Sequence, residues 1–333
     1  MNGTRLPLTA RRPLTEAPPI TSSKAALEPG VLDLWWFPYE EFEERRELFA
    51  AYESLLTADE RVRHQRLRFE RDKRQFLATR ALVRTVLSCY EPAVSPLEWR
   101  FAIGERGKPS ISEPAAASGW HFNLSNTRGL VVCAVSGVHS RLGVDVERLD
   151  RSNDLLALAD RYFSPLEVAE LRALPSSEQP SRFFDYWTLK ESYIKAHGLG
   201  LAIPLDSFSF LLGANSPRQS LARSEAASGR RSSGEPNASS SEPFGDMSDE
   251  PLSDPSDEPV SGLVPSIGIV FDPRRDDDPA RWSFALFDAA PRYRLAVGVE
   301  TWGSRLTVRA RRFIPLGMEL SGEAQQEGDG ASC

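Results

Sequence analysis

The chain has 333 residues, of which 41% are hydrophobic, and this is enough for two ordinary domains or one large one with a sizeable core. Its cysteines, Cys89, Cys133 and Cys333, have neither disulfide nor metal-ligand spacing, and the sequence contains no run of 18 apolar residues and no secretory signal. These features argue against a disulfide-rich secreted protein and against a membrane protein, and we expect a reduced protein in the cytoplasm.

The net charge of −7 is unevenly distributed along the chain. Residues 212–262 carry −5 and residues 313–333 carry −4, so the remainder carries +2. Between Arg61 and Arg84, nine Arg and Lys residues stand against two acidic ones. A basic helix is usually a solvated surface, but it can equally hold nucleotide phosphates or an acidic protein partner.

The first segments read as a leader, a strand and helices. Residues 1–29 mix Pro, Thr, Arg and Ala without periodicity, which predicts a disordered leader. The apolar run 31–37 predicts a strand, and residues 39–56 are predicted to form a helix. Thr57 and Glu60 have the spacing of a capping box, which would open the Arg-rich helical segment that continues to residue 90.

A strand at 98–103 is predicted to end in a turn, because Gly104, Gly107 and Pro109 fall within six residues. A hairpin is predicted to follow, with strands at 121–125 and 130–135. Alternation along its first strand places Phe122 and Leu124 inward, and Asn123 and Ser125 outward. This polar face is available either to a phosphate or to solvent.

The segment 142–147 alternates strictly, so Leu142, Val144 and Val146 should face a core. Asp145 and Glu147 then lie side by side on the other face. Like charges at this spacing repel each other, and a cation such as Mg²⁺, which prefers oxygen ligands, would remove the penalty. Taken alone, the pattern is more often a polar strand edge.

Two helices are predicted near 154–161 and after the Ser164 cap, and a third covers 183–197. In the third helix, helical spacing places Phe184, Trp187, Glu191 and Ile194 on one face, with Lys195 beside them. A carboxylate in an apolar stripe costs several kcal/mol unless a cation, a metal or a proton compensates it. The alternative is a surface Glu191–Lys195 pair, which contributes only about 0.2–0.5 kcal/mol.

The last part of the chain reads as strands around an insertion. His197, the last residue of the helix predicted at 183–197, is expected to complement the negative C-terminal end of that helix. Strands are predicted at 208–212, 267–271, 282–287 and 293–300. The stretch at about 213–265 is rich in Ser, Pro, Gly, Asp and Glu, which predicts a disordered insertion at a hairpin tip, and residues 313–333 read as a polar tail.

Four motifs in order resemble those of one enzyme family. They are Gly107-Lys108-Pro109, Phe122-Asn123-Leu124-Ser125, GVDVE at 143–147 and WTLKESYIK at 187–195. The last two resemble the signature pair of the Sfp-type 4′-phosphopantetheinyl transferases, (I/V)G(I/V)D(I/V)E and W-x-x-K-E-x-x-x-K. The resemblance implies an α+β fold with two similar α/β halves, here 30–140 and 141–312, related by a pseudo-twofold axis.

The resemblance also implies an activity: transfer of the 4′-phosphopantetheine group of coenzyme A to a serine of an apo acyl or peptidyl carrier protein, with release of 3′,5′-ADP. It assigns Asp145, Glu147 and Glu191 as Mg²⁺ ligands and Lys195 as the lysine that contacts the pyrophosphate. Glu191 is the favoured acceptor of the serine proton, with a metal-bound water as the alternative. A chain holding both halves favours a monomer, and neither nucleic acid nor a membrane is expected as a partner.

Further positions map to the coenzyme A site by the same resemblance. Lys108 and Pro109 match family residues that contact the adenine and 3′-phosphate end of coenzyme A. Ser125 and Asn126 match a pair that contacts the pyrophosphate, although the second residue is often His in the family, and an amide carries no charge. Basic residues stand where the family binds the 3′-phosphate, with different spacing: Arg71, Arg74 and Arg80.

Two other functions are compatible with parts of this pattern. One is a different Mg²⁺-dependent phosphotransfer or phosphodiester-cleaving enzyme, which would not need the Gly-Lys-Pro motif. The other is a non-catalytic module that binds coenzyme A or a carrier, which would not need all the predicted metal ligands. The carrier could belong to fatty acid, polyketide, peptide (secondary metabolism) or lysine biosynthesis, and the sequence does not choose among them.

Overall fold

The computed structural model describes residues 12–13, 29–117, 119–150, 154–212, 267–289 and 292–317. The predicted insertion, the polar tail beyond residue 317 and most of the leader lie outside these ranges. Arg11–Leu211 and Ile267–Cys333 form one compact unit, which holds the elements that follow.

The helices of the described residues are α1 (Arg46–Ser54), α2 (Ala58–Arg66), α3 (Glu70–Tyr90), α4 (Leu155–Tyr162), α5 (Pro165–Ala173) and α6 (Gln179–His197). The strands are β1 (Arg12–Pro13), β2 (Val31–Phe37), β3 (Arg100–Ile103), β4 (Pro109–Glu113), β5 (His121–Thr127), β6 (Leu130–Ser136), β7 (Leu142–Arg148), β8 (Phe208–Leu211), β9 (Gly268–Phe271), β10 (Trp282–Asp288), β11 (Tyr293–Glu300) and β12 (Thr307–Arg312). Short 3₁₀ helices include η1 (Tyr39–Phe42), η4 (Leu205–Ser207) and η5 (Pro279–Arg281).

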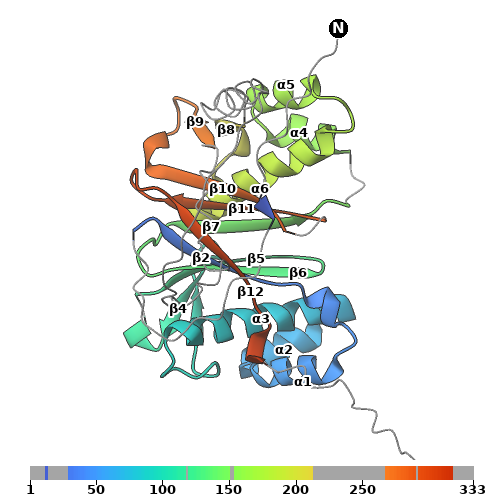
Figure 1. The fold of residues 1–333 in the computed structure, drawn as a ribbon, viewed down its shortest axis with the longest axis vertical. Coiled ribbons are helices and arrows are strands. Elements are labelled where there is room, and N and C mark those ends of the chain that lie inside the picture. Colours follow the sequence, from blue (N-terminus) through green and yellow to red (C-terminus); the bar gives the residue numbers. More distant parts are fainter. Residues whose placement is uncertain are drawn as a thin grey trace, which may run out of the picture. The chain divides into compact units, whose positions relative to one another are not determined.

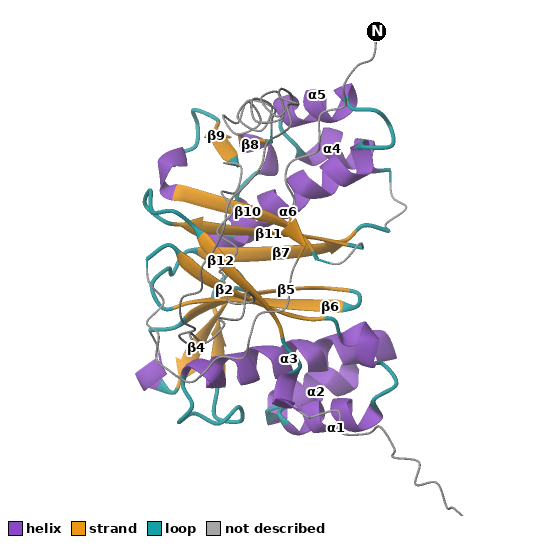
Figure 2. Cartoon of the chain, viewed as in Figure 1, coloured by secondary structure: helices purple, strands orange, loops and turns teal. Residues whose placement is uncertain are grey.

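This α+β unit is built in layers of helix, sheet, sheet and helix (Figures 1 and 2). One sheet has the strand order β12-β2-β6-β5 and is covered by α3, while the other has the order β1-β10-β11-β7 and is covered by α6. Two hairpins, β3-β4 and β8-β9, flank them. The two-half architecture that the sequence predicts is therefore confirmed.

A shared apolar core joins the two sheets. Leu34 and Val132 of one sheet pack in the same buried cluster as Val144, Val146 and Leu295 of the other. The alternation along β7 thus predicts its buried face correctly. β7 lies between the other sheet and α6, and successive side chains of a strand point to opposite faces, so its apolar side chains all face the other sheet.

Several predicted elements appear as expected, including the strands β2, β10 and β11 and the hairpin β5-β6. Both capping boxes also form, with Thr57 and Ser164 each accepting from the backbone three residues on. The helix predicted at 39–56 is wrong as one element. It is divided into η1 and α1, and Glu40 within η1 accepts a hydrogen bond from the Tyr293 hydroxyl at 2.7 Å, which anchors η1 to the opposite half.

Three strands were not predicted. β4 pairs with β3 across the Gly-Lys-Pro turn, and β1, within the predicted leader, runs parallel to β10. β12 runs parallel to β2, so the end of the second half joins the sheet of the first half. Arg309 and Arg311 fix this pairing through ion pairs of 2.6 and 2.7 Å with the buried Asp33.

No helix in the described part of the chain is long and apolar enough to cross a membrane.

Candidate functional site

Asp145, Ser125 and Lys195 meet where the two halves join. The Lys195 ammonium lies 2.7 Å from Asp145 Oδ1 and donates to Ser125 Oγ at 2.9 Å. Ser125 Oγ in turn donates to Asp145 Oδ1 at 3.0 Å and accepts from the Val146 amide at 3.2 Å. A hydroxyl has one donor and two acceptor sites, so these contacts occupy the whole capacity of Ser125. Three motifs far apart in the sequence are thus brought into direct contact.

The outward orientation predicted for Asn123 and Ser125 is wrong, since both side chains are buried. The face of β5 expected to meet phosphate or solvent lies against β7 instead. Asn123 Oδ1 accepts from the Val144 amide at 2.9 Å, in the same way that Ser125 accepts from Val146. Alternation identified the polar face, but the strand that covers it comes from the other half of the chain.

Glu191 is half-buried on α6, close enough to Asp145 for the two charges to interact. Burial is the main cause that raises the pKa of Glu191, Asp145 raises it further, and Lys195 opposes both. The predicted apolar stripe is too narrow a description of α6, because Tyr186, Leu189 and Tyr193 on other sides are fully buried as well. The prediction of a carboxylate in a largely apolar environment is nevertheless confirmed.

The close packing of α6 on β7 depends on Gly143. A Cβ at this position would lie 2.0 Å from the Ser192 carbonyl oxygen and 2.5 Å from the Ala196 amide nitrogen. Only glycine therefore allows the helix to approach the strand at this point. The first residue of the GVDVE motif thus sets the distance between the strand that carries Asp145 and the helix that carries Glu191 and Lys195.

Lys190, beside Glu191, belongs to a buried ion pair that sequence reasoning missed. Its ammonium lies 2.7 Å from Glu167 Oε2 and also donates to the carbonyls of Leu205 and Phe208 at 2.6 and 2.7 Å. Both charged side chains are at most 1% exposed. The Ser164 cap, to which the sequence assigns a structural role, therefore holds Glu167 where it anchors α6 to α5 and β8. The Lys-Glu dipeptide was the available signal, but it does not reveal which lysine faces the site.

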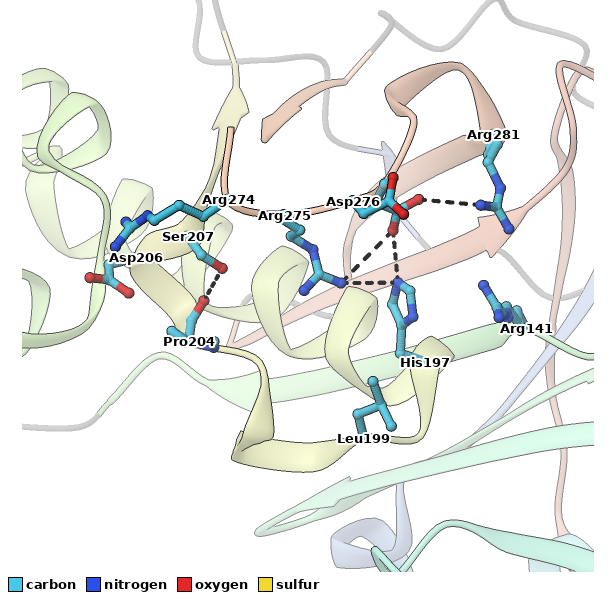
Figure 3. A pocket seen from close by; sticks show the side chains of 11 residues that line it. Arg141, His197, Leu199, Pro204, Asp206, Ser207, Arg274, Arg275, Asp276 and Arg281 are labelled. Carbon is cyan, nitrogen blue, oxygen red and sulfur yellow. Dashed lines mark hydrogen bonds and ion pairs between the residues drawn. The ribbon is translucent and has the colours of Figure 1, made fainter. Parts of the chain in front are cut away.

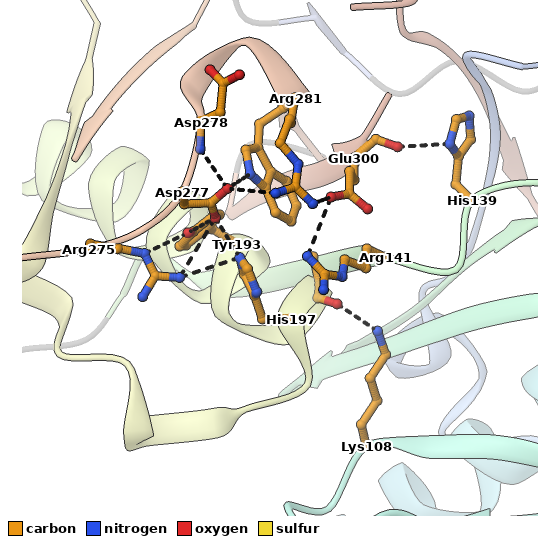
Figure 4. Close-up of polar contacts among 12 residues, drawn as sticks. Lys108, His139, Arg141, Tyr193, His197, Arg275, Asp277, Asp278, Arg281 and Glu300 are labelled. Atoms are coloured by element: carbon orange, nitrogen blue, oxygen red, sulfur yellow. Dashed lines mark hydrogen bonds and ion pairs between the residues drawn. The ribbon is translucent and has the colours of Figure 1, made fainter. Parts of the chain in front are cut away.

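Lys108 extends from the Gly-Lys-Pro turn to the start of β7 and the end of α6 (Figure 4). Its ammonium donates to the carbonyls of Leu142 at 3.1 Å and Ala196 at 3.0 Å. Burial, assisted by the charge of Arg141, lowers the pKa of Lys108 to about 8. Pro109 begins β4 on the other side of the turn.

The prediction for His197 is wrong, because burial lowers the pKa of this histidine to about 4 and leaves it uncharged at neutral pH. Lys108 supplies the cation at the end of α6 instead.

Asn126 lies at the edge of the contact between the halves and faces α3. Its side chain accepts a hydrogen bond from Gln75 and donates to Thr79 Oγ1 at 3.4 Å. Neither contact reaches Lys195.

The three arginines predicted to bind the 3′-phosphate pair with different acidic residues. Arg71 lies 3.4 Å from Asp72, Arg74 lies 3.3 Å from Glu43, and Arg80 lies 3.4 Å from Glu60. Arg80 is the most buried of them, and burial lowers its pKa. Each of the three guanidinium groups thus has its own acidic partner.

The carboxylates have two properties that suit a divalent cation. Asp145 Oδ2 is buried without a hydrogen-bond donor, and the raised pKa of Glu191 marks a charge that lacks compensation. Carboxylate oxygens are the ligands that Mg²⁺ prefers. In the described part of the chain, no three His, Cys, Asp or Glu side chains are already arranged around one point as a metal site. The donor set fits a cation, and the Lys195 ammonium contacts one of its carboxylates.

A separate hollow of about 670 Å³ lies beside the C-terminal end of α6 (Figure 3). His197 in its wall is on the side of α6 away from Lys195, because positions two apart on a helix differ by about 200°. Three arginines in the wall of this hollow form ion pairs. Arg275 and Arg281 lie 3.8 Å from Asp277, and Arg141 lies 3.4 Å from Glu300 (Figure 4). None of the predicted site residues lines this hollow.

Comparison with known proteins covers both halves. Residues 40–137 match the family model described as 4′-phosphopantetheinyl transferase, N-terminal, and residues 141–236 match that of the 4′-phosphopantetheinyl transferase superfamily. The 4′-phosphopantetheinyl transferase HetI of Nostoc sp. is 39% identical over 169 residues, which are 51% of this chain and 69% of that protein. The 4′-phosphopantetheinyl transferase Sfp of Bacillus subtilis is 35% identical over 159 residues, 48% of this chain and 67% of Sfp.

A third relative shows similar coverage. The phosphopantetheinyl transferase of Thraustochytrium sp. is 30% identical over 202 residues, 55% of this chain and 67% of that protein. The order of motifs, the two halves and these relatives agree. The chain belongs to the 4′-phosphopantetheinyl transferase superfamily, whose enzymes transfer 4′-phosphopantetheine from coenzyme A to carrier proteins, and it is an enzyme of this activity.

Proposed function

We propose that the junction around Asp145 is the transfer site, where a serine of an apo carrier protein attacks the pyrophosphate of coenzyme A and 3′,5′-ADP leaves. The observation that carries the proposal is the contact of Lys195 with both Asp145 and Ser125, beside Glu191. One partly buried junction thus contains the Lys195 ammonium for phosphate oxygens, carboxylates for a metal, and the Glu191 carboxylate as a proton acceptor.

Asp145, Glu147 and Glu191 would hold Mg²⁺, and when bound the ion would neutralise phosphate oxygens of coenzyme A. Glu147 follows Asp145 by two residues on β7, so the two carboxylates share the face of the strand that packs on α6. Asp145 contributes the oxygen that lacks a hydrogen-bond donor.

Glu191 would take the proton of the attacking serine. In the protein without a metal, burial and Asp145 raise the pKa of Glu191, which favours it as a base because a proton acceptor is most effective when its pKa approaches the working pH; a bound cation would act in the opposite direction. Lys195 would stabilise the negative charge that grows on the departing 3′,5′-ADP. Its present contacts with Asp145 and Ser125 hold the ammonium in the junction where that charge develops.

The remaining predicted residues would bind the rest of coenzyme A. We assign Lys108 and Pro109 to the adenine and 3′-phosphate end, Ser125 and Asn126 to the pyrophosphate, and the α3 arginines to the 3′-phosphate: Arg71, Arg74 and Arg80. The contacts that Ser125 already makes mean that its binding to the pyrophosphate requires an exchange of partners. We further propose a monomer acting in the cytoplasm, with halves divided near residue 140, because one chain supplies both sides of the junction.

The decisive experiment is incubation of the purified protein with coenzyme A, Mg²⁺ and several apo carrier proteins, followed by intact-mass spectrometry. We expect a carrier mass gain equal to one phosphopantetheinyl group, abolished by EDTA and by alanine at the carrier serine. Cleavage of coenzyme A without carrier modification would instead indicate a phosphodiester-cleaving enzyme. Binding of coenzyme A without either reaction would indicate a non-catalytic module.

A further inference from the structure

The edge of β7 that faces the first half is bonded by side chains rather than by a strand. β7 and β5 are the outer strands of different sheets. Three side chains of the first half reach the β7 backbone: Lys108 donates to the Leu142 carbonyl at 3.1 Å, Asn123 Oδ1 accepts from the Val144 amide at 2.9 Å, and Ser125 Oγ accepts from the Val146 amide at 3.2 Å. We name this set, Lys108, Asn123 and Ser125, the side-chain ladder.

The ladder bonds lie on alternate residues of β7, and Asp145 lies between two of them, Val144 and Val146. On its other edge, β7 pairs with β11, where Asp145 is opposite Ala296. The backbone of Asp145 is therefore fixed from both edges of the strand. Asn123 and Asp145 are 4% and 5% exposed, so water has little access to replace a lost bond.

The three ladder residues differ in what else they do. Ser125 and Lys108 are already assigned to the coenzyme A site by motif, and Ser125 contacts Asp145 directly. Asn123 is bonded to the residue before Asp145 and makes no contact with Asp145 or Lys195 among the interactions described. Its effect on the site must pass through the backbone of β7.

We propose that Asn123 is a positioning residue of the transfer reaction: through the Val144 amide it sets where the Asp145 carboxylate stands relative to Lys195 and Glu191. The proposal rests on the proposed function, because it requires Asp145 to be a metal ligand. Residues that orient metal ligands typically change metal affinity or activity about 10- to 100-fold when replaced. We therefore expect a loss of about tenfold or more when the bond from Val144 is removed.

The test compares three variants with the wild-type protein. Asn123→Leu has the same branched shape and number of heavy atoms but no acceptor, whereas Asn123→Asp keeps an oxygen for the Val144 amide. Ser136→Ala removes a buried hydroxyl that accepts from Val138 and His139, at the far end of the same hairpin. It serves as the control for a purely structural loss.

Two readouts separate positioning from stability. Mn²⁺ binding to the protein without coenzyme A is measured by calorimetry, and kcat and the Mg²⁺ concentration for half-maximal activity are measured below the melting temperature. We expect Asn123→Leu to weaken Mn²⁺ binding and raise the half-maximal Mg²⁺ concentration at least about tenfold, with the carrier KM unchanged. Asn123→Asp should restore binding, and Ser136→Ala should lower the melting temperature without changing either metal measurement.

The inference is overturned if Asn123→Leu binds Mn²⁺ as the wild type does, or if Ser136→Ala weakens binding equally. If Asn123→Leu does not fold, Asn123→Ala, which has no acceptor for the Val144 amide, is judged by the same two criteria. Failure of the wild type to bind Mn²⁺ or to modify a carrier would refute the proposed function itself, which distinguishes the two failures.

Discussion

Lys195 and Asp145 form an ion pair of 2.7 Å across the contact between α6 and β7. Fifty residues separate them in the chain, and their elements meet because Gly143 leaves room for the helix backbone. The pair provides a charge-balanced arrangement without a metal. In the proposed function, Asp145 would hold a divalent cation, and Lys195 would then exchange this carboxylate partner for phosphate oxygens of coenzyme A.

Asp145→Ala and Glu191→Ala should each reduce transfer by at least about 100-fold with the fold intact, because each removes a charge on which metal binding and phosphate neutralisation depend. Turnover would be measured by carrier mass shift and folding by circular dichroism. Asp145→Asn provides the matched variant, since it keeps an oxygen for Ser125 and Lys195 but loses the charge. Near wild-type turnover of either alanine variant at limiting Mg²⁺ would refute the metal assignment.

Glu191→Gln should stabilise the protein at neutral pH when divalent cations are absent. Burial and Asp145 raise the pKa of Glu191 above its ordinary value of 4.5, so the folded state binds a proton more readily than the unfolded state. The wild type therefore loses stability, relative to the Glu191→Gln variant, as pH rises from 4.5 through the pKa of the folded state.

Melting temperatures of the two proteins would be compared in EDTA from about pH 4 to pH 8, where each 1 kcal/mol corresponds to about 2–4 °C. The difference should be small at the acid end, grow with pH, and shrink when Mg²⁺ is added. A difference that is independent of pH would show that ionisation of Glu191 is not its cause.

Lys190→Met should destabilise the fold by about 3–5 kcal/mol, because it leaves the fully buried Glu167 without its cation. The free energy of unfolding would be measured in urea. The double variant Lys190→Met, Glu167→Gln should recover part of this loss, since no uncompensated buried charge remains. If the single variant is as stable as the wild type, the buried Lys190–Glu167 pair does not stabilise the fold.

Deletion of residues 214–260, with the β8-β9 hairpin closed by a short Gly-containing turn, should leave the melting temperature and kcat nearly unchanged. The hairpin is paired up to Leu211 and Gly268, and the deleted stretch is acidic and poor in apolar residues. The control is a full-length protein with the same stretch replaced by a Gly-Ser linker. A large fall in melting temperature or in coenzyme A affinity would contradict the prediction.

The sequence by itself determined most of the elements and the chemistry. Strict alternation in 142–147 predicted which side of β7 faces the core, and Thr57 and Ser164 marked two helix starts, because these signals act between neighbours in the chain. The placement of Glu191 in a largely apolar helix likewise followed from local spacing. The ordered motifs then indicated the family, which the relatives confirm.

Only the tertiary structure decided how these pieces meet. The outward direction of Asn123 and Ser125 and the single helix at 39–56 were wrong because each depends on a partner from the opposite half, and the role of His197 was wrong because tertiary packing buries its ring. A strand pattern distinguishes two faces but does not say what covers the polar one. Here β7 covers it, and its backbone amides donate to Asn123 and Ser125, while Asp145 on the same strand contacts Lys195.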